Sequence, residues 1–349
     1  MKEEDIKKCI VWYSQEKVLY ELLGKKIKEL INELLESERI NYQFIECRVK
    51  DEESFKNKII EGICFKPEEM QDLLGIRIIG YVNSDIDKIV NIIKDNFEID
   101  KKKSEDKSEK LGIDKVGYRS IHLITKLPQK RIELPEYKKF EGKYFEIQIR
   151  TILQHAWAEI QHDRNYKFSG ILPESIKRRF SLLAGHLEIA DNEFNSISKL
   201  IEDYSKDVSE KTKSGELNIP IDSTSLRQYL NEKFKDLYIF NKLEPNFGPK
   251  DNLSATNIRE LNKMGIKTLK ELDNIIPKDF VNNLLIYNPI EPLNFCGLIR
   301  DILIINYKEK YFEDAWEKDW GFISKMGILE VYNIDTEKIS KKYKINILD

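Results

Sequence analysis

The stretch Tyr144–Lys167, YFEIQIRTILQHAWAEIQHDRNYK, predicts a strand that leads directly into a helix. Its first residues alternate between apolar and polar side chains, as in a strand with one buried face. The polar positions place an acid, an amide and a guanidinium in one row: Glu146, Gln148 and Arg150. An ordinary half-buried strand shows water a varied set of small polar residues, so this row indicates a functional site.

Three further segments repeat this placement of polar side chains on an apolar strand. They are Ile45–Lys50 (IECRVK), Leu73–Val82 (LLGIRIIGYV) and Gly117–Leu127 (GYRSIHLITKL). A charged side chain among isoleucines costs several kcal/mol unless a partner meets it. If the four strands share one sheet, a single face collects cations and two acids: Arg48, Lys50, Arg77, His122, Arg150, Asp72 and Glu146. Such a face suits a polyphosphate with bound Mg²⁺, because carboxylates hold the metal and cations neutralise phosphate oxygens.

These residues resemble the RelA/SpoT-type (p)ppGpp synthetase domain, as found in small alarmone synthetases. The matching segments follow the family's order and cover roughly residues 10–205: RVKDEESFKNK (Arg48–Lys58), QDLLGIRII (Gln71–Ile79), GYRSIH (Gly117–His122), EIQIRT with HAWAEIQH (Glu146–His162), and YK (Tyr166–Lys167). The resemblance implies an α+β fold, with a nucleotidyltransferase-like mixed β-sheet flanked by helices. It also implies an ATP-dependent GTP pyrophosphokinase, which moves the β,γ-pyrophosphate of ATP to the ribose 3′-hydroxyl of GDP or GTP and releases AMP.

The resemblance further implies a role for each matching polar residue. Asp72 is expected to bind Mg²⁺, and Glu146 to share the metal and to orient or deprotonate the acceptor hydroxyl. The ATP phosphates are expected to meet a cationic run and a strand arginine: Arg48, Lys50, Ser54, Lys58 and Arg77. The acceptor nucleotide is expected to contact a second set: Lys115, Tyr118, His122, Gln148 and His155.

One position departs from the family, in which Lys-Pro-Asn usually precedes GYRS. Here the segment reads Asp114-Lys115-Val116, so the expected lysine is displaced by one position. The departure leaves the acceptor open, since toxic relatives of the family pyrophosphorylate the tRNA 3′ end or adenosine nucleotides. An alternative of another class is a catalytically inactive sensor that binds alarmone, although a pure binder has no need of both Asp72 and Glu146.

Apolar residues recur at alternating spacings of four and three from Ile176 to Tyr204, which predicts a helix with a seam of four heptads. This helix, 174–205, could pack on the synthetase domain or pair with a second copy of the chain in a homo-oligomer. The polar segment Lys206–Glu216 indicates a domain boundary. We therefore expect a synthetase domain at 1–206, a linker at 207–216 and a smaller, mostly α-helical C-terminal domain at 217–349.

The C-terminal domain carries no motif to which catalytic chemistry can be attached. Its segment 254–276 resembles a helix-hairpin-helix module, with two short helices joined through Gly265 and with Thr268 as the cap of the second. Such a module either packs within its own domain or touches a nucleic-acid backbone, as in tRNA.

Composition limits the remaining classes of protein. The formal net charge of −3 over 349 residues argues against a protein that coats nucleic acid by bulk electrostatics. No run approaches the roughly 20 apolar residues of a membrane span, and the N-terminal MKEEDIKKCI lacks the order of a secretory signal. The four cysteines are far apart and form no CxxC pair, which predicts neither a zinc site nor a disulfide framework. We expect a cytoplasmic protein.

Overall fold

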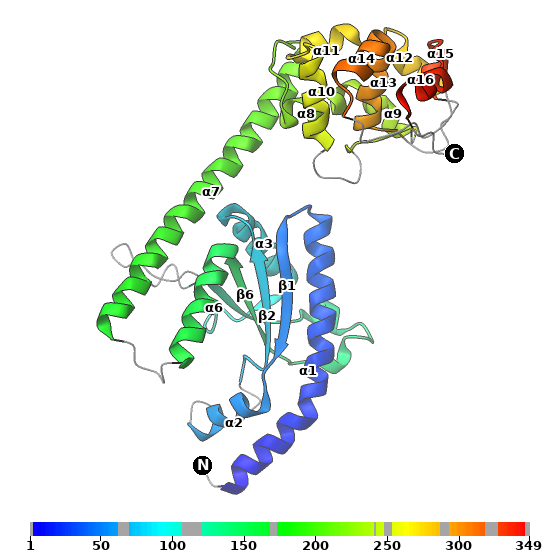
Figure 1. The fold of residues 1–349 in the computed structure, drawn as a ribbon. Coiled ribbons are helices and arrows are strands. Elements are labelled where there is room, and N and C mark those ends of the chain that lie inside the picture. Colours follow the sequence, from blue (N-terminus) through cyan, green and yellow to red (C-terminus); the bar gives the residue numbers. More distant parts are fainter. Residues whose placement is uncertain are drawn as a thin grey trace. The chain divides into compact units, whose positions relative to one another are not determined.

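A computed structural model describes residues 3–61, 70–106, 120–167, 173–240, 242–247, 253–286, 293–317 and 327–345. They form two compact units, Met1–Lys199 and Leu200–Asp349, each described by itself (Figure 1). Among the helices of these residues, none is both long enough and apolar enough to cross a membrane.

The N-terminal unit is built on a mixed, six-stranded sheet in the order β1-β2-β6-β5-β3, with β4 paired to β5. The strands are β1 (Tyr42–Val49), β2 (Leu74–Gly80), β3 (Glu98–Ile99), β4 (Glu105–Asp106), β5 (Ile121–Lys126) and β6 (Phe145–Thr151). The central pair β2 and β6 is parallel, whereas the other described pairs are antiparallel. The four segments with polar rows therefore supply β1, β2, β5 and β6 of one sheet, and the expected α+β architecture is confirmed.

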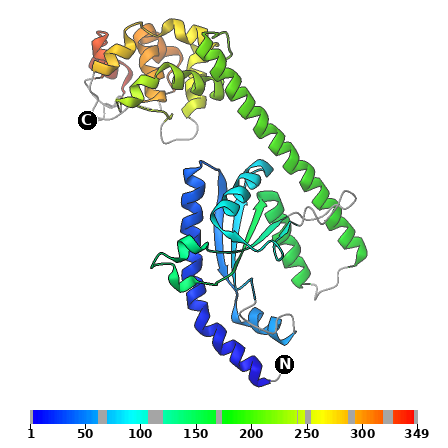
Figure 2. The same ribbon diagram turned by 180° about the vertical axis from the view of Figure 1, so that it is seen from behind.

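One face of the sheet is covered by α1 (Glu3–Ser37) and α3 (Asn83–Asn96), which bury their apolar residues against it. The strand residues that meet them are fully buried, among them Ile76, Ile78, Ile147 and Ile149. Helix α6 (Ile152–Lys167) follows β6 and crosses β6 and β2 on the opposite face, which carries the polar rows (Figure 1). Figure 2 shows the unit from behind, with α1 running along the sheet. The short elements α2 (Glu52–Ile60), α5 (Gln129–Ile132) and the 3-10 helix η2 (Lys138–Phe140) complete the unit.

Helix α7 (Glu174–Ser214) starts in the N-terminal unit, where polar contacts fix it to the sheet and α3. The Thr151 hydroxyl donates to Asp191 at 2.8 Å, and the Ser84 amide donates to the side chain of Asn195 at 2.9 Å. The expected linker is thus helical as far as Ser214. Its residues contain no proline and include several good helix formers, so a solvent-facing helix accommodates them as readily as a loop.

Gly24 sets how closely α1 approaches the sheet. A Cβ atom at this position would lie 2.2 Å from Sγ of Cys47 on β1 and 3.0 Å from Cδ1 of Leu74 on β2. Glycine in a helix interior costs up to about 1 kcal/mol relative to alanine. The residue is retained at that cost because the interface leaves no room for a methyl group.

We predict that Gly24→Ala destabilises the N-terminal unit by about 1–2 kcal/mol, although alanine is the better helix former, because overpacking of the α1–β1 contact outweighs propensity. Hydrogen exchange of the β1 and β2 amides would measure the change within this unit. Cys47→Ala removes the clashing sulfur, so the double variant is expected to recover part of the loss. A Gly24→Ala variant as stable as the parent chain would contradict this view of the contact.

The C-terminal unit is mostly helical, as expected, with one short parallel strand pair. Its elements are α8 (Ser223–Lys233), α9 (Lys235–Ile239), β7 (Leu243–Glu244), α10 (Leu253–Lys263), α11 (Leu269–Ile275), α12 (Phe280–Ile286), β8 (Leu293–Asn294), α13 (Phe295–Tyr307), α14 (Glu309–Asp314), α15 (Ile328–Val331) and α16 (Thr336–Tyr343). Helix α13 lies at the centre of the core, with most of its apolar side chains buried.

The α10–α11 hairpin has the expected turn at Gly265, whose φ of 81° favours glycine. Thr268 caps α11, since its hydroxyl accepts from the Glu271 amide at 3.3 Å. Glu271 in return accepts from the amides of Lys267 and Thr268, at 2.7 and 2.9 Å. The next two amides, of Leu269 and Lys270, donate to carbonyl groups in the segment before α8. The hairpin is thereby tied into its own unit.

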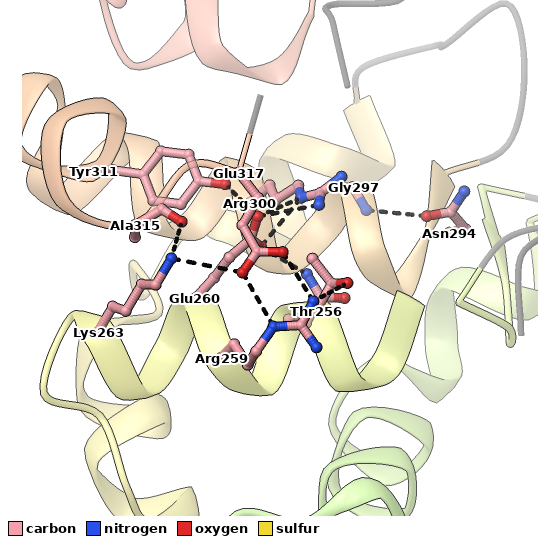
Figure 3. Close-up of polar contacts among 11 residues, drawn as sticks. Thr256, Arg259, Glu260, Lys263, Asn294, Gly297, Arg300, Tyr311, Ala315 and Glu317 are labelled. Atoms are coloured by element: carbon pink, nitrogen blue, oxygen red, sulfur yellow. Dashed lines mark hydrogen bonds and ion pairs between the residues drawn. The ribbon is translucent and has the colours of Figure 1, made fainter. Parts of the chain in front are cut away.

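A buried carboxylate organises the polar interior of this unit (Figure 3). Glu260 on α10 is fully buried and pairs with Arg300 on α13, whose Nη2 lies 3.0 Å from Oε1. The same carboxylate accepts from the Tyr311 hydroxyl at 3.0 Å and from the Asn257 amide at 3.1 Å. On the surface of the same helix, Arg259 makes a two-pronged pair with Glu317 instead.

We predict that Glu260→Gln destabilises the C-terminal unit by about 3 kcal/mol, because it removes the negative charge that the buried Arg300 guanidinium meets on α10. Glu317→Gln is the matched control, since the same change in a partly exposed pair should cost less than about 1 kcal/mol. Urea unfolding followed by hydrogen exchange in α10 and α13 would measure both. Equal losses of unfolding free energy in the two variants would show that the buried pair stabilises the unit no more than the partly exposed pair does.

Candidate active site

The strand register brings the polar rows together on the face crossed by α6. Glu146 on β6 pairs in register with Gly75 on β2, and Gln148 lies between Arg77 of β2 and His122 of β5. Neighbouring strands lie about 4.8 Å apart, so side chains of these rows are within reach of one another. Two groups of contacts result, one around Asp72 and one around Glu146.

Asp72 lies immediately before β2, where two lysines meet it. Its Oδ2 is 2.8 Å from Nζ of Lys50, at the end of β1, and 2.5 Å from Nζ of Lys58 on α2. Burial opposes the charged form of Asp72, but the hydrogen bonds and charges of the two lysines outweigh it and lower the pKa of this carboxyl group. Asp72 is therefore ionised at neutral pH.

Local structure aims both lysines at Asp72. The side chain of Asp51 caps α2 by accepting from the Ser54 amide at 2.8 Å, which fixes the start of the helix that carries Lys58. The Lys50 carbonyl accepts from the Tyr13 hydroxyl of α1. The Tyr13 ring also stacks on Phe55 of α2, with 4.2 Å between ring centroids. Helices α1 and α2 thus hold the lysine pair in place.

Glu146 has a hydrogen-bond donor at each of its carboxylate oxygens. Nδ1 of His122 lies 2.6 Å from Oε1, and the Gln148 amide donates to Oε2 at 2.9 Å. Burial raises the pKa of Glu146, the hydrogen bond and charge of His122 and the Gln148 amide lower it, and the charge of Asp72 raises it, with a net lowering. Among these effects the charge of Asp72 is the smallest, and the expectation that both carboxylates bind one metal ion stays a prediction.

The polar row on β6 continues beyond Gln148. Nη2 of Arg150 donates to Oε1 of Gln148 at 2.9 Å, and Nε of Arg150 donates to the Ser120 hydroxyl at 3.0 Å. Arg150 and Ser120 are both buried, at 7% and 2% exposure. On the other side of the row, Nε2 of His122 is buried and has no hydrogen-bond partner among the described residues.

The other candidate residues do not all join these two groups. Arg48 is largely exposed and lies 3.6 Å from Asp51. Arg77 meets two glutamates rather than the acid pair: its Nη1 is 3.2 Å from Glu159 on α6 and 3.6 Å from Glu46 on β1. The chain itself therefore supplies the anions that the partly buried Arg77 pairs with.

His155 lies on α6, edge-on to Phe44 of β1, with 5.5 Å between ring centroids. Burial lowers its pKa, and the charges of Arg150 and Arg77 act in the same direction. Lys115 and Tyr118 lie outside the described residues. Sequence reasoning did not assign Glu159 to the site, although this acid lies within the matching HAWAEIQH run.

The two acids fit a magnesium ion that is held jointly with a nucleotide. The described residues contain no cluster of three or more His, Cys, Asp or Glu side chains able to hold a metal alone. Mg²⁺ is usually bound through one or two carboxylates together with substrate phosphates and water. Asp72 and Glu146 supply such a pair, and Lys50 and Lys58 supply cations for the phosphates.

A known protein family matches the part of the chain that contains this site. The model of the region found in RelA and SpoT proteins matches residues 47–171, which include both Asp72 and Glu146. GTP pyrophosphokinase YwaC of Bacillus subtilis is 32% identical over 162 residues, which are 44% of this chain and 73% of that protein. GTP pyrophosphokinase YjbM of the same organism is 30% identical over 154 residues, 43% of this chain and 67% of that protein.

Solved structures were also found for the same part of the chain. The crystal structure of small alarmone synthetase 1 from Bacillus subtilis matches with a TM-score of 0.47 and 25% identity, over 55% of this chain and 98% of that one. The same protein bound to its product pppGpp matches with a TM-score of 0.45 and 28% identity, over 54% and 97%. On the sequence match to YwaC and the family region at residues 47–171, this chain belongs to the RelA/SpoT family of pyrophosphokinase enzymes.

Proposed function

We propose that this chain transfers the β,γ-pyrophosphate of ATP to the ribose 3′-hydroxyl of GDP or GTP. The acceptor oxygen forms a bond to the β-phosphorus, the bond from that phosphorus to the α,β-bridging oxygen breaks, and AMP leaves. The observation that supports this most is the pair of ionised carboxylates with cations beside them, Asp72 immediately before β2 and Glu146 on the neighbouring parallel strand β6. The names of the two relatives, both GTP pyrophosphokinases, point to the same acceptor.

In this proposal Asp72 and Glu146 would hold Mg²⁺, and the ion would supply positive charge to the transferring phosphates. Lys50 and Lys58, which neutralise Asp72 in the nucleotide-free chain, turn to phosphate oxygens when ATP arrives. Arg48 and Ser54 line the same side, and Arg77 exchanges Glu159 or Glu46 for phosphate. The glutamate that Arg77 leaves has a side chain about half exposed, so water can solvate it, and binding leaves no buried carboxylate or ammonium group without a partner.

Glu146 also accepts a hydrogen bond from the 3′-hydroxyl of the acceptor. Its lowered pKa makes it a weak base, so holding the hydroxyl in line with the β-phosphorus is the larger part of its role. The neighbouring Nε2 of His122 faces the acceptor phosphates, and Gln148, His155, Lys115 and Tyr118 complete the acceptor contacts. Tyr118 stacks on the guanine base.

Radiolabelled ATP with Mg²⁺ and one acceptor at a time tests the reaction and its substrate. We expect label on GDP or GTP, with an equal amount of AMP released. Label on AMP or on deacylated tRNA instead would favour the activity of the toxic relatives. Nucleotide binding with no transfer to any acceptor would favour the inactive sensor.

Asp72→Asn and Glu146→Gln are each expected to lower the rate of transfer by at least about 100-fold, because each removes a metal ligand or the oriented acceptor group. Glu98→Gln is the matched control, since Glu98 also pairs with a lysine of the same sheet, Lys126, at 2.7 Å, but takes no part in the site. Full transfer activity in Asp72→Asn would contradict the proposal.

The C-terminal hairpin lends no support to the tRNA alternative. Main-chain amides are among the groups through which a protein contacts nucleic-acid phosphates. Here the amides of Met264, Gly265 and Ile266 donate to carbonyl groups of α10. The next four main-chain amides, of residues 267–270, donate to the Glu271 side chain and to carbonyl groups in the segment before α8. The hairpin serves as a packing unit.

We also propose that α7 pairs with a second copy of the chain. Large apolar side chains of its heptad seam are exposed to solvent, among them Leu183, Phe194 and Ile197, at 43–54% exposure. A contiguous exposed apolar surface is uncommon on a monomer, and a seven-residue repeat is typical of a helix that meets another helix with the same repeat. A second α7 offers that repeat.

Light scattering during gel filtration tests the pairing. The parent chain is expected to elute as a dimer or larger assembly, and a Phe194→Lys, Ile197→Lys variant as a monomer with unchanged helix content. Asp203→Lys introduces the same residue on the opposite face of α7 and should leave the assembly intact. A monomeric parent chain would contradict the proposal.

A further inference from the structure

Each oxygen of Glu146 accepts from a side chain, His122 at Oε1 and Gln148 at Oε2, and Gln148 is itself held by Arg150. At Oε2 the contacts form a series from Ser120 through Arg150 and Gln148 to Glu146, with distances of 3.0, 2.9 and 2.9 Å. The series joins β6 with the residue that precedes β5. Its far end, Ser120 and Arg150, is buried, whereas the near end faces the site.

The chemistry of the groups gives this series a direction. A guanidinium group has donors only, so Arg150 can meet only the carbonyl oxygen of the Gln148 amide. That contact turns the amide nitrogen of Gln148 toward Glu146. A carboxylate only accepts, so this is the one orientation of the amide that satisfies both neighbours. Ser120, at Nε of Arg150, restricts rotation of the guanidinium plane.

We propose that Arg150 and Ser120 are positioning residues for pyrophosphate transfer, which act on Glu146 through Gln148 and touch neither nucleotide. The inference rests on the proposed role of Glu146 in orienting the acceptor hydroxyl. A carboxylate that works by orientation depends on its own rotamer, and a misplacement of about 1 Å can cost about 100-fold in rate. His122 holds Oε1, and the buried series holds Oε2, so the carboxylate plane has two supports.

A structural role for the same bonds is the competing explanation, because they also link two neighbouring strands. The two explanations differ in what the substitutions change. Loss of a strand link lowers stability and leaves turnover in the folded fraction as it was. Loss of positioning lowers kcat and leaves the KM for ATP and for the acceptor unchanged, since neither residue contacts substrate.

The test uses the full-length chain and steady-state transfer at saturating Mg²⁺. Arg150→Lys keeps the charge but loses the planar fork, and we expect kcat to fall by about 10- to 100-fold with both KM values within about twofold. Ser120→Ala should lower kcat by about threefold. Thr125→Val is the matched control: the buried Thr125 hydroxyl donates to the Phe145 carbonyl at 3.2 Å, so it links the same two strands on the other face. It should lower the melting temperature and leave kcat unchanged.

A double variant shows whether Arg150 acts through Gln148. In a Gln148→Ala background, Arg150→Lys should lower kcat by no more than about twofold, because the connection to Glu146 is already broken. The inference is overturned if Arg150→Lys leaves kcat of the parent chain unchanged, if it lowers kcat equally in both backgrounds, or if it changes only KM. If Arg150→Lys does not fold, Ser120→Ala decides by the same criteria.

Glu146→Gln separates failure of this inference from failure of the proposed function. Transfer at the parental rate in Glu146→Gln would remove the role of Glu146, and the positioning role would fall with it. Loss of transfer in Glu146→Gln together with unchanged kcat in Arg150→Lys and Ser120→Ala would overturn the positioning role alone.

Discussion

Asp72 and Glu146 are like charges at two neighbouring strands of one sheet, β2 and β6, and side chains from several elements of the N-terminal unit stabilise each carboxylate. Asp72 and Glu146 are both partly buried and both ionised, so their repulsion has to be offset locally. The offset is divided between different elements: lysines from β1 and α2 neutralise Asp72, and His122 with Gln148 satisfies Glu146. The parallel register of β2 and β6 supplies the geometry. A metal ion with nucleotide phosphates could then enter between two acids that are already arranged.

Alternation within each segment predicted which side chains of β6 are buried, and Phe145, Ile147 and Ile149 are all at 0% exposure. That the four segments share a sheet was implied by the resemblance to the family, not by alternation, and the structure confirms it. The partners of Arg77 could not be predicted, because Glu46 reaches it through the β1–β2 register and Glu159 through the path of α6 across the sheet. Register between strands and the direction of a following helix depend on packing over the whole unit, which local patterns do not contain.

For the C-terminal unit, the sequence predicted secondary structure but no functional site. Its helices and the turn at Gly265 could be predicted from caps and breakers, but no chemistry could be. Glu271 and the segment before α8 accept hydrogen bonds from the main-chain amides of this hairpin, which favours the interpretation as a packing unit. The buried pair of Glu260 and Arg300 was also beyond prediction, because α10 and α13 are separated by some 40 residues and either side chain would suit a solvated face. Because both side chains are buried, the pair contributes to stability in a way that a surface pair does not.

A crystal structure of the chain with Mg²⁺ and a non-hydrolysable ATP analogue tests the central claim most directly. The account predicts one metal ion within about 2.1 Å of a carboxylate oxygen of both Asp72 and Glu146, with Lys50 and Lys58 moved from Asp72 to phosphate oxygens. A metal ion bound elsewhere, with the two lysines still on Asp72 and the analogue in place, would contradict it.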